Sequence, residues 1–337
     1  MTARHVALLA GLAALAVVLA WALGRTGGGA DSSRDMRLLP QLQEAVNDVS
    51  GIVIEPAGED SFRVSRESHA WVAPGLHGYR ADAGQVRRLV LRLAEARILE
   101  TKTANPALYA RLGVGDPAAG DGAGTRVTLE GVPGLAPVII GDRESPGGRG
   151  TYVRRSGEDT AWLVDQMITA ESAPLDWLDR DVMDVPADEV MALEIRHPGG
   201  GTLSVQRDPD SGQLVLASLP EGRQLSGPTA PAALARALAG LRLDDVRPAA
   251  EVESEGDPVV ARLTLSDGTV IEARTRTIDE TPWTIFEVRP GGGDSGATAT
   301  AALQGRVSGW AYALPAWKAE QLTRRTEDLL KPLPETD

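Results

Sequence analysis

Apolar and polar residues alternate along residues 51–55 and 61–66, and this period of two predicts two β-strands joined by a glycine-bearing turn. Between residues 82 and 99 the apolar positions change to a helical spacing, and Asp82 is expected to cap that helix. Further strands are expected at 125–130, 136–140 and 151–164. The first half of the chain therefore predicts an antiparallel sheet with a helix packed on one face.

The second half of the chain repeats the pattern of the first. Residues 49–66 (VSGIVIEPAGEDSFRVSR) align without a gap on residues 190–207 (VMALEIRHPGGGTLSVQR). The shared positions are apolar or turn-forming, and the polar exception is the arginine shared as Arg66 and Arg207. Two further matches follow in the same order. Residues 93–97 align with residues 238–242, and residues 126–129 align with residues 262–265. These matches predict a duplicated domain whose copies differ by loop insertions and deletions.

The second unit is expected to contain strands at 190–196, 202–207 and 213–217, a helix over 230–241, and strands at 269–276 and 282–289. A final helix is expected over 316–330. We predict an α+β fold, with two tandem duplicated units of mainly antiparallel sheet and a packed helix behind one N-terminal transmembrane helix. The expected parts are an anchor or signal segment (1–24), a linker and lead-in helix (25–47), the first unit (48–172), a connector (173–188), the second unit (189–290), and a loop with the C-terminal helix (291–337).

The N-terminal segment predicts a membrane anchor. Residues 6–23 carry no charge and are mostly Ala, Leu and Val, near the lower end of the span of about 17–25 residues that crosses a bilayer. Trp21 lies near its far end, where an interfacial indole is favourable. Ala20 and Ala22 also fit the small-residue pattern before a signal-peptide cleavage site. We expect a retained single-pass anchor with the bulk of the chain exported, and a cleaved signal peptide as the alternative.

Charge and cysteine content narrow the possible partners. The formal net charge is −13, and the chain has no cysteine. So acidic a protein is not expected to bind nucleic acid or anionic lipid headgroups through long-range attraction. Without cysteine, the chain has no disulfides, thiolate nucleophiles or zinc–thiolate sites.

Residues that could carry catalysis are sparse. His69 and His77 lie on either side of a Pro-Gly turn, but their spacing is not a known zinc pattern. Ser65 or Ser68 could form a triad with His69 and Asp82, although the chain has no Gly-x-Ser-x-Gly elbow to expose a nucleophile. It also has no Walker-type Gly-Lys-Ser/Thr motif. We therefore predict a protein that is not an enzyme and that needs no cofactor or metal.

The candidates for partner binding are Asp176, Asp179, Asp181, Trp310, Tyr312 and Trp317. The aspartates form an acidic run in the connector, for which a solvated face is the simpler explanation. The aromatic residues lie close together in the tail, outside the repeats. Because the positions shared by the two copies serve folding, a specific function is expected where the copies differ.

Short motifs along the chain resemble a known bacterial family. They are IVI at 52–54, FRVSR at 62–66, WV at 71–72, LGV at 112–114, VIIG at 138–141, GTYVR at 150–154, WLV at 162–164, WAYALP at 310–315 and DLL at 328–330. With the N-terminal apolar segment, they resemble the domain-of-unknown-function family 4340 between residues 36 and 331. Members of that family are typically membrane-anchored, and many are encoded beside an ABC-type permease and a gliding-motility-type auxiliary component. The family has no catalytic residues to carry over.

The resemblance implies an accessory role in the bacterial envelope. We expect a non-enzymatic scaffold protein, anchored in the inner membrane by residues 6–23, with its bulk in the periplasm. Its expected partner is an ABC-type permease or an auxiliary envelope protein. Two alternatives stay open. One is a periplasmic hydrolase or carbohydrate-binding enzyme with a site between the units, and the other is a ligand-binding component that feeds a transporter.

Overall fold

The computed structural model describes residues 36–331 except 121, 146, 228 and 292–296. The chain forms two compact units that divide between Leu178 and Asp179. This division lies within residues 173–188, the segment expected to be a connector. The expected membrane anchor, residues 6–23, lies outside the described residues. Among the helices that the structure describes, none is long and apolar enough to cross a membrane.

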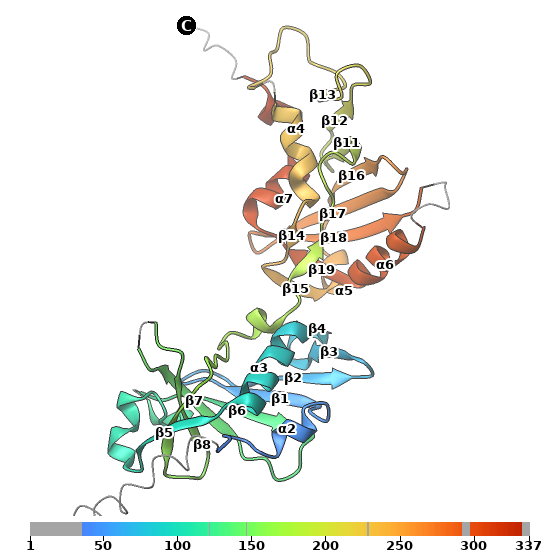
Figure 1. Cartoon of the computed structure of the whole chain (residues 1–337). Helices are drawn as coiled ribbons and strands as arrows, with labels where there is room; N and C mark the ends of the chain where they lie inside the picture. The colour runs from blue at the N-terminus through green and yellow to red at the C-terminus, as the bar shows by residue number, and fades with distance from the viewer. Residues whose placement is uncertain (1–35, 121, 146, 228, 292–296, 332–337) are drawn as a thin grey trace, which may run out of the picture. The chain divides into compact units, whose positions relative to one another are not determined.

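Unit 1 is built on one mainly antiparallel sheet with the strand order β4-β3-β2-β1-β6-β7-β8-β9-β5 (Figure 1). Its strands are β1 (Gly51–Glu55), β2 (Phe62–Glu67), β3 (Ala70–Ala73), β4 (Tyr79–Arg80), β5 (Ile98–Thr103), β6 (Thr125–Glu130), β7 (Val138–Arg143), β8 (Thr151–Arg155) and β9 (Ala161–Val164). Its helices are α2 (Leu42–Ala45) and α3 (Ala83–Glu95), with 3₁₀ turns η1 (Pro74–Leu76), η2 (Pro106–Arg111), η3 (Pro117–Ala119) and η4 (Pro174–Trp177).

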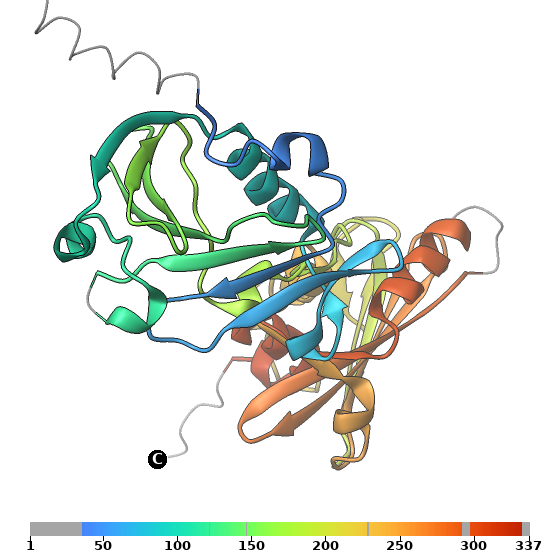
Figure 2. The same ribbon diagram turned by 90° about the horizontal axis from the view of Figure 1, so that it is seen from below.

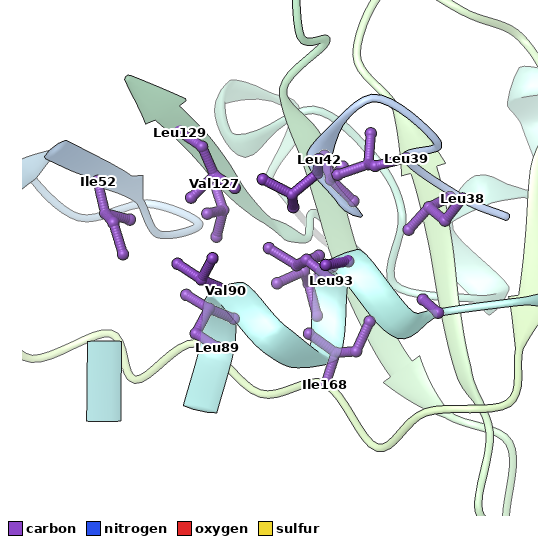
Figure 3. Packing of buried hydrophobic residues seen from close by; sticks show 14 of the residues in the cluster. Leu38, Leu39, Leu42, Ile52, Leu89, Val90, Leu93, Val127, Leu129 and Ile168 are labelled. Atoms are coloured by element: carbon purple, nitrogen blue, oxygen red, sulfur yellow. The ribbon is translucent and has the colours of Figure 1, made fainter. Parts of the chain in front are cut away.

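The long helix α3 supplies the core of unit 1. It begins as expected at Asp82, whose Oδ1 accepts a hydrogen bond from the main-chain N–H of Gln85 at 3.0 Å. Leu89 and Leu93 are buried against strand residues, and Figure 3 shows them on the same side of the helix as Val127. Burying one such aliphatic side chain contributes about 1.5–3 kcal/mol, so the apolar stripe holds α3 on the sheet.

The lead-in segment also belongs to this core. Leu38, Leu39 and Leu42, expected in a linker and lead-in helix, are buried beside α3 (Figure 3). The short helix α2 packs against α3, as Figure 2 shows. Arg155 of β8 also holds this segment, because its Nε donates to the main-chain oxygen of Leu38 at 2.8 Å. Unit 1 therefore begins at least ten residues earlier than the alternating pattern indicates.

Unit 2 is built on a sheet with the order β13-β12-β11-β16-β17-β18-β19-β15 (Figure 1). Its strands are β11 (Val190–Arg196), β12 (Thr202–Arg207), β13 (Leu214–Leu216), β15 (Asp245–Pro248), β16 (Val259–Leu265), β17 (Val270–Ile278), β18 (Thr281–Arg289) and β19 (Trp310–Ala313), and a separate ribbon pairs β10 (Asp181–Met183) with β14 (Leu241–Arg242). Its helices are α4 (Ala230–Leu234), α5 (Ala249–Glu253), α6 (Ala297–Val307) and α7 (Ala316–Thr323), with 3₁₀ turns η5 (Ala235–Leu238) and η6 (Thr326–Leu329).

The C-terminal part of the chain is integral to unit 2. Strand β19 pairs with both β18 and β15, and α7 packs against β16, β17 and β18. The helix expected over 316–330 ends at Thr323, and the chain then makes the turn η6. Leu330 bridges to Leu225, so the second half of the expected helix is instead used to close the unit. The described residues 297–331, expected as part of a loop and C-terminal helix, are therefore part of the folded unit.

The two sheets share a strand order. Strands β1–β3 correspond to β11–β13, strands β6–β9 correspond to β16–β19, and β5 corresponds to β15. At the centre of unit 1, Ile52 pairs with Leu129, and at the same place in unit 2, Leu193 pairs with Leu263. The sequence alignment placed Leu129 on Leu265 instead, two residues further along. Because side chains alternate with a period of two, this slip leaves each side chain on the expected face.

Candidate functional site

The acidic residues of the connector are largely held within unit 2. Both carboxylate oxygens of Asp179 accept from Arg306 Nη2, at 2.9 and 2.8 Å. Oδ1 of Asp181 lies 3.3 Å from Nε of Arg242 on an exposed surface. Oδ1 of Asp184 accepts a hydrogen bond from the main-chain N–H of Gly240 at 2.7 Å. Asp176 is exposed in η4 of unit 1. The acidic run is thus split between the units, and Asp179 and Asp184 anchor the chain.

The aromatic residues of the tail differ in exposure. Tyr312 is fully buried in β19, with its ring centroid 6.1 Å from that of Phe286. Tyr312, a candidate for partner binding, therefore has no side-chain surface that a partner could reach in the folded unit. Trp310 is half-buried, and Trp317 on α7 is 56 % exposed. Trp317 is the tail aromatic that a partner could reach most readily.

The histidines that the structure describes do not form a metal site. His197 Nε2 lies 3.2 Å from the main-chain oxygen of Arg324, and His77 ends η1 with a left-handed backbone. Within the described ranges, no group of three or more metal-ligating side chains could hold a metal ion. Asp82, considered above as a triad member, caps α3. His69 is exposed and lies at the edge of a groove in unit 1.

That groove runs between the β2–β3 hairpin and α3 and has a volume of about 530 Å³. It is lined by Val46, Asn47, Val49, Arg66, His69, Trp71, Ala83, Val86, Arg87, Val90 and Leu91. Arg66 and Trp71 are paired residues of β2 and β3, so their side chains leave the sheet on the same face. The Arg66 guanidinium lies 5.9 Å from the Trp71 ring centroid and donates to the main-chain oxygen of Asn47 at 3.0 Å.

The groove combines positive charge with an apolar floor. Arg66, Arg87 and His69 contribute the basic groups, and among the described residues no acidic side chain lines the groove. The side chains of Arg87 and His69 have no hydrogen-bond or ion-pair partner within the part of the chain that the structure describes. Val90 is buried in the floor and Trp71 is half-buried. This arrangement suits a ligand that carries both an apolar group and an anion.

Unit 2 has a groove at the corresponding place, with a volume of about 380 Å³. Its lining residues are Ala187, Asp188, Arg207, Gly212, Gln213, Leu214, Thr229, Ala232, Ala235 and Arg236. Arg207 pairs with Leu214 across the strands, as Arg66 pairs with Trp71. Arg207 donates to the main-chain oxygens of Val190 at 2.8 Å, Ala187 at 3.0 Å and Gly212 at 2.6 Å. The shared arginine thus occupies equivalent places in two different environments.

A buried arginine lies elsewhere in unit 1. Arg154, which is 4 % exposed, donates to Val114 O at 3.0 Å, to Glu158 O at 3.1 Å and to Asp116 Oδ2 at 3.1 Å. Arg126 donates to the other Asp116 oxygen at 2.9 Å. Burial raises the pKa of Asp116, but the hydrogen bonds and charges of both arginines outweigh burial and hold the pKa below its usual range. This network joins strands to loops and has a structural role.

Sequence reasoning did not predict the groove, because it places specific function where the two copies differ. The shared arginine is noted there only as the polar position among apolar matches, at Arg66 and Arg207. Arg87 was missed because its place on the groove depends on the angle at which α3 crosses the hairpin. Helical spacing shows which face of α3 is apolar, but not what lies beside its polar edge.

Comparison with known proteins gives one match. A family model described as Domain of unknown function (DUF4340) matches residues 71–259, which is more than half of the chain. The matched region begins in β3 of unit 1 and ends at the start of β16 in unit 2. No curated protein and no solved structure matches the chain.

Proposed function

The chain belongs to the family of domains of unknown function DUF4340, and we propose that it is a non-enzymatic binding protein of the bacterial envelope. In this proposal residues 6–23 anchor the chain in the inner membrane, and the two α+β units lie in the periplasm. The chain serves as an accessory or scaffold subunit of an ABC-type transport or envelope complex. The uncharged, Ala- and Leu-rich character of residues 6–23 supports the anchor.

The two units arise, in this proposal, from duplication of one domain. The matching strand orders support it, as do the equivalent pairings of Ile52 and Leu193. The shared arginine in equivalent grooves supports it further. Duplication supplies two similar scaffolds, and a binding function can then be retained or acquired by one copy while the other serves folding.

The groove of unit 1 is the observation that carries the binding role. Its basic side chains surround an apolar floor, although the protein as a whole is strongly acidic. Side chains of this kind recognise and hold a partner, since they offer hydrogen-bond donors, positive charge and apolar area. Arginine and tryptophan are also the residue types enriched where protein partners bind most tightly.

The test is co-purification of the full chain from native membranes after mild detergent extraction. We expect a permease-type membrane protein to accompany it. Photo-crosslinking residues placed at Arg87 and Trp317 identify which surface the partner touches, with a residue at Asp60 in the exposed β1–β2 turn as the control. Recovery of the chain alone under every mild condition, with no crosslink above the Asp60 control, contradicts the proposal.

A ligand-binding component that feeds a transporter is the second candidate. The volume of the unit 1 groove, about 530 Å³, falls within the range of about 300–1,000 Å³ typical of small-molecule sites. A ligand that binds the folded state raises its thermal midpoint by mass action. Screening small amphipathic carboxylates for such a shift tests this candidate, and a shift without any co-purifying protein favours it over the accessory role.

A further inference from the structure

Arg66 and Arg207, the two copies of the shared arginine, differ in how many guanidinium N–H donors remain available to a ligand. Arg207 directs its guanidinium at the main-chain oxygens of Ala187, Val190 and Gly212. These contacts tie together the lead-in to β11 and the β12–β13 turn. The exposed Arg66 side chain donates one hydrogen bond among the described residues, to Asn47 O. The arginine at this position thus has a structural role in unit 2. In unit 1 its guanidinium keeps N–H donors that can bind a ligand.

The side chains around Arg66 favour a ligand with negative charge. Arg87 on α3 and His69 at the end of the hairpin face the same groove. Within the described ranges, neither side chain has a partner carboxylate. A concave surface lined by one sign of charge concentrates its field, even on a protein whose net charge is −13. The groove therefore favours an anion, and guanidinium groups favour carboxylates or phosphates through paired N–H donors.

The floor of the groove selects for an apolar group beside that anion. Val46, Leu91 and Trp71 line the groove and are half-buried, and the Trp71 ring centroid lies 5.9 Å from the Arg66 guanidinium. An aromatic ring under a guanidinium supplies a flat apolar surface and leaves the outward N–H donors accessible. A ligand that is only charged would leave this surface exposed to water.

We propose that this groove binds a short acidic segment of a partner protein. In this arrangement an aliphatic or aromatic side chain of the segment rests on Trp71, and flanking carboxylates pair with Arg66 and Arg87. The inference rests on the proposed function as a partner-binding protein and names the chemistry of the partner. A short segment brings its charges only to the groove. An anionic bilayer presents a wide negative surface, which the protein's own net charge repels beyond the groove.

Binding of a labelled synthetic peptide to the full chain in detergent tests the proposal. The probe has a Leu-Trp core flanked by aspartates, and its matched control carries asparagines instead. We expect the aspartate peptide to bind in a salt-sensitive manner and the asparagine peptide to bind at least fivefold more weakly. The double substitution R66Q/R87Q weakens binding about tenfold, since it removes two exposed charge contacts. The control R88Q removes a neighbouring charge on α3 that pairs with Asp82 outside the groove, and it changes binding less than twofold.

Several results would overturn the proposal. They are equal binding of the two peptides, equal effects of R66Q/R87Q and R88Q, or groove-dependent binding to phosphatidylglycerol vesicles without peptide binding. Because Arg87 has no described partner, R87E serves where the double variant unfolds, and it must also weaken the peptide. If a protein co-purifies equally with wild type and R87E, the accessory role stands and the groove assignment fails. If the peptide binds through the groove but no protein co-purifies, the proposed function fails instead.

Discussion

The ammonium group of Lys318 lies 2.5 Å from the carbonyl oxygen of Ala239 inside unit 2, and its side chain is almost fully buried. The carbonyl oxygen of Arg236 accepts a second hydrogen bond from it at 2.5 Å. Both carbonyls belong to the end of the α4–η5 helical segment, where main-chain oxygens lack helical partners. A cation at this end of a helix satisfies those oxygens and joins α7 to the end of η5.

Replacing Lys318 should destabilise unit 2. In K318M the two carbonyls lose their donor at a part-buried position, which costs about 1–3 kcal/mol in the free energy of unfolding. Urea unfolding followed by tryptophan fluorescence measures this loss. The control is K102M, since Lys102 is only half-buried and pairs with the exposed Glu100 at 2.7 Å, and we expect its effect to stay below about 1 kcal/mol. Equal effects of the two substitutions would contradict the role given to Lys318.

The same lysine gives a pH dependence with a defined sign. Burial lowers the pKa of Lys318 from its ordinary value of 10.5, although Asp184 acts in the opposite direction. As pH rises through the lowered pKa, the folded protein releases this proton before the unfolded chain does. The unfolded chain then binds more protons, so the lysine's contribution to stability increases with pH up to about 10.5. The stability difference between wild type and K318M should therefore grow from neutral to alkaline pH.

Asp116 should contribute stability that is lost in acid. Its folded-state pKa lies below the ordinary value of 3.8, so its contribution is present above that value and disappears as pH falls through the folded-state pKa. The D116N variant should lose about 1 kcal/mol at neutral pH, because Arg126 and Arg154 lose their shared carboxylate. It should also show a weaker fall in stability below about pH 4. Urea unfolding between neutral and acidic pH, with D60N in the exposed β1–β2 turn as control, checks both effects.

Substitutions of the two shared arginines should differ in their effect on the free energy of unfolding. R207A removes the donor to three main-chain oxygens and should lower the free energy of unfolding by about 1–3 kcal/mol. R66A removes an exposed side chain with one main-chain hydrogen bond, and its effect should stay below about 1 kcal/mol. Denaturant unfolding of both variants measures the difference. A larger loss for R66A would show that the unit 1 copy is the structural one.

Arg306 should control how firmly the start of unit 2 is held. It contacts both carboxylate oxygens of Asp179 and the main-chain oxygen of Asp181, so R306A should loosen residues 179–184. We expect faster cleavage of this stretch by an aspartate-specific protease, because cleavage requires local opening. R242A is the matched control, since its ion pair with Asp181 is largely exposed and contributes little. Equal cleavage rates in the two variants would argue against the anchoring role.

The sequence predicted the elements whose signals are local. The β1–β2 and β17–β18 strands follow from alternation, and Asp82 marks the start of α3. Strand β5 was missed because residues 98 and 99 continue the helical spacing and most of the strand is polar and exposed. Strand β19 was missed for a different reason. Its four residues WAYA carry no alternation, and its place in the sheet depends on pairing with the distant β15.

The candidate site shows the same limit. The repeat identified Arg66 as a shared position, but the repeat alone cannot distinguish a guanidinium held by three carbonyls from one that is exposed. That distinction depends on Gly212 and Ala187 approaching Arg207 through turns whose geometry is specific to unit 2. Tyr312 illustrates the converse, because an aromatic residue near the C-terminus suggested a surface although its ring lies in the core.

The passage from one unit to the other occupies a single peptide bond. Leu178 is buried and bridged to Ala81 in unit 1, and Asp179, the next residue, is held by Arg306 in unit 2. Because each of these adjacent residues is fixed by contacts within its own unit, unit 1 is ordered to its last residue and unit 2 from its first. The boundary between the units therefore contains no linker residue.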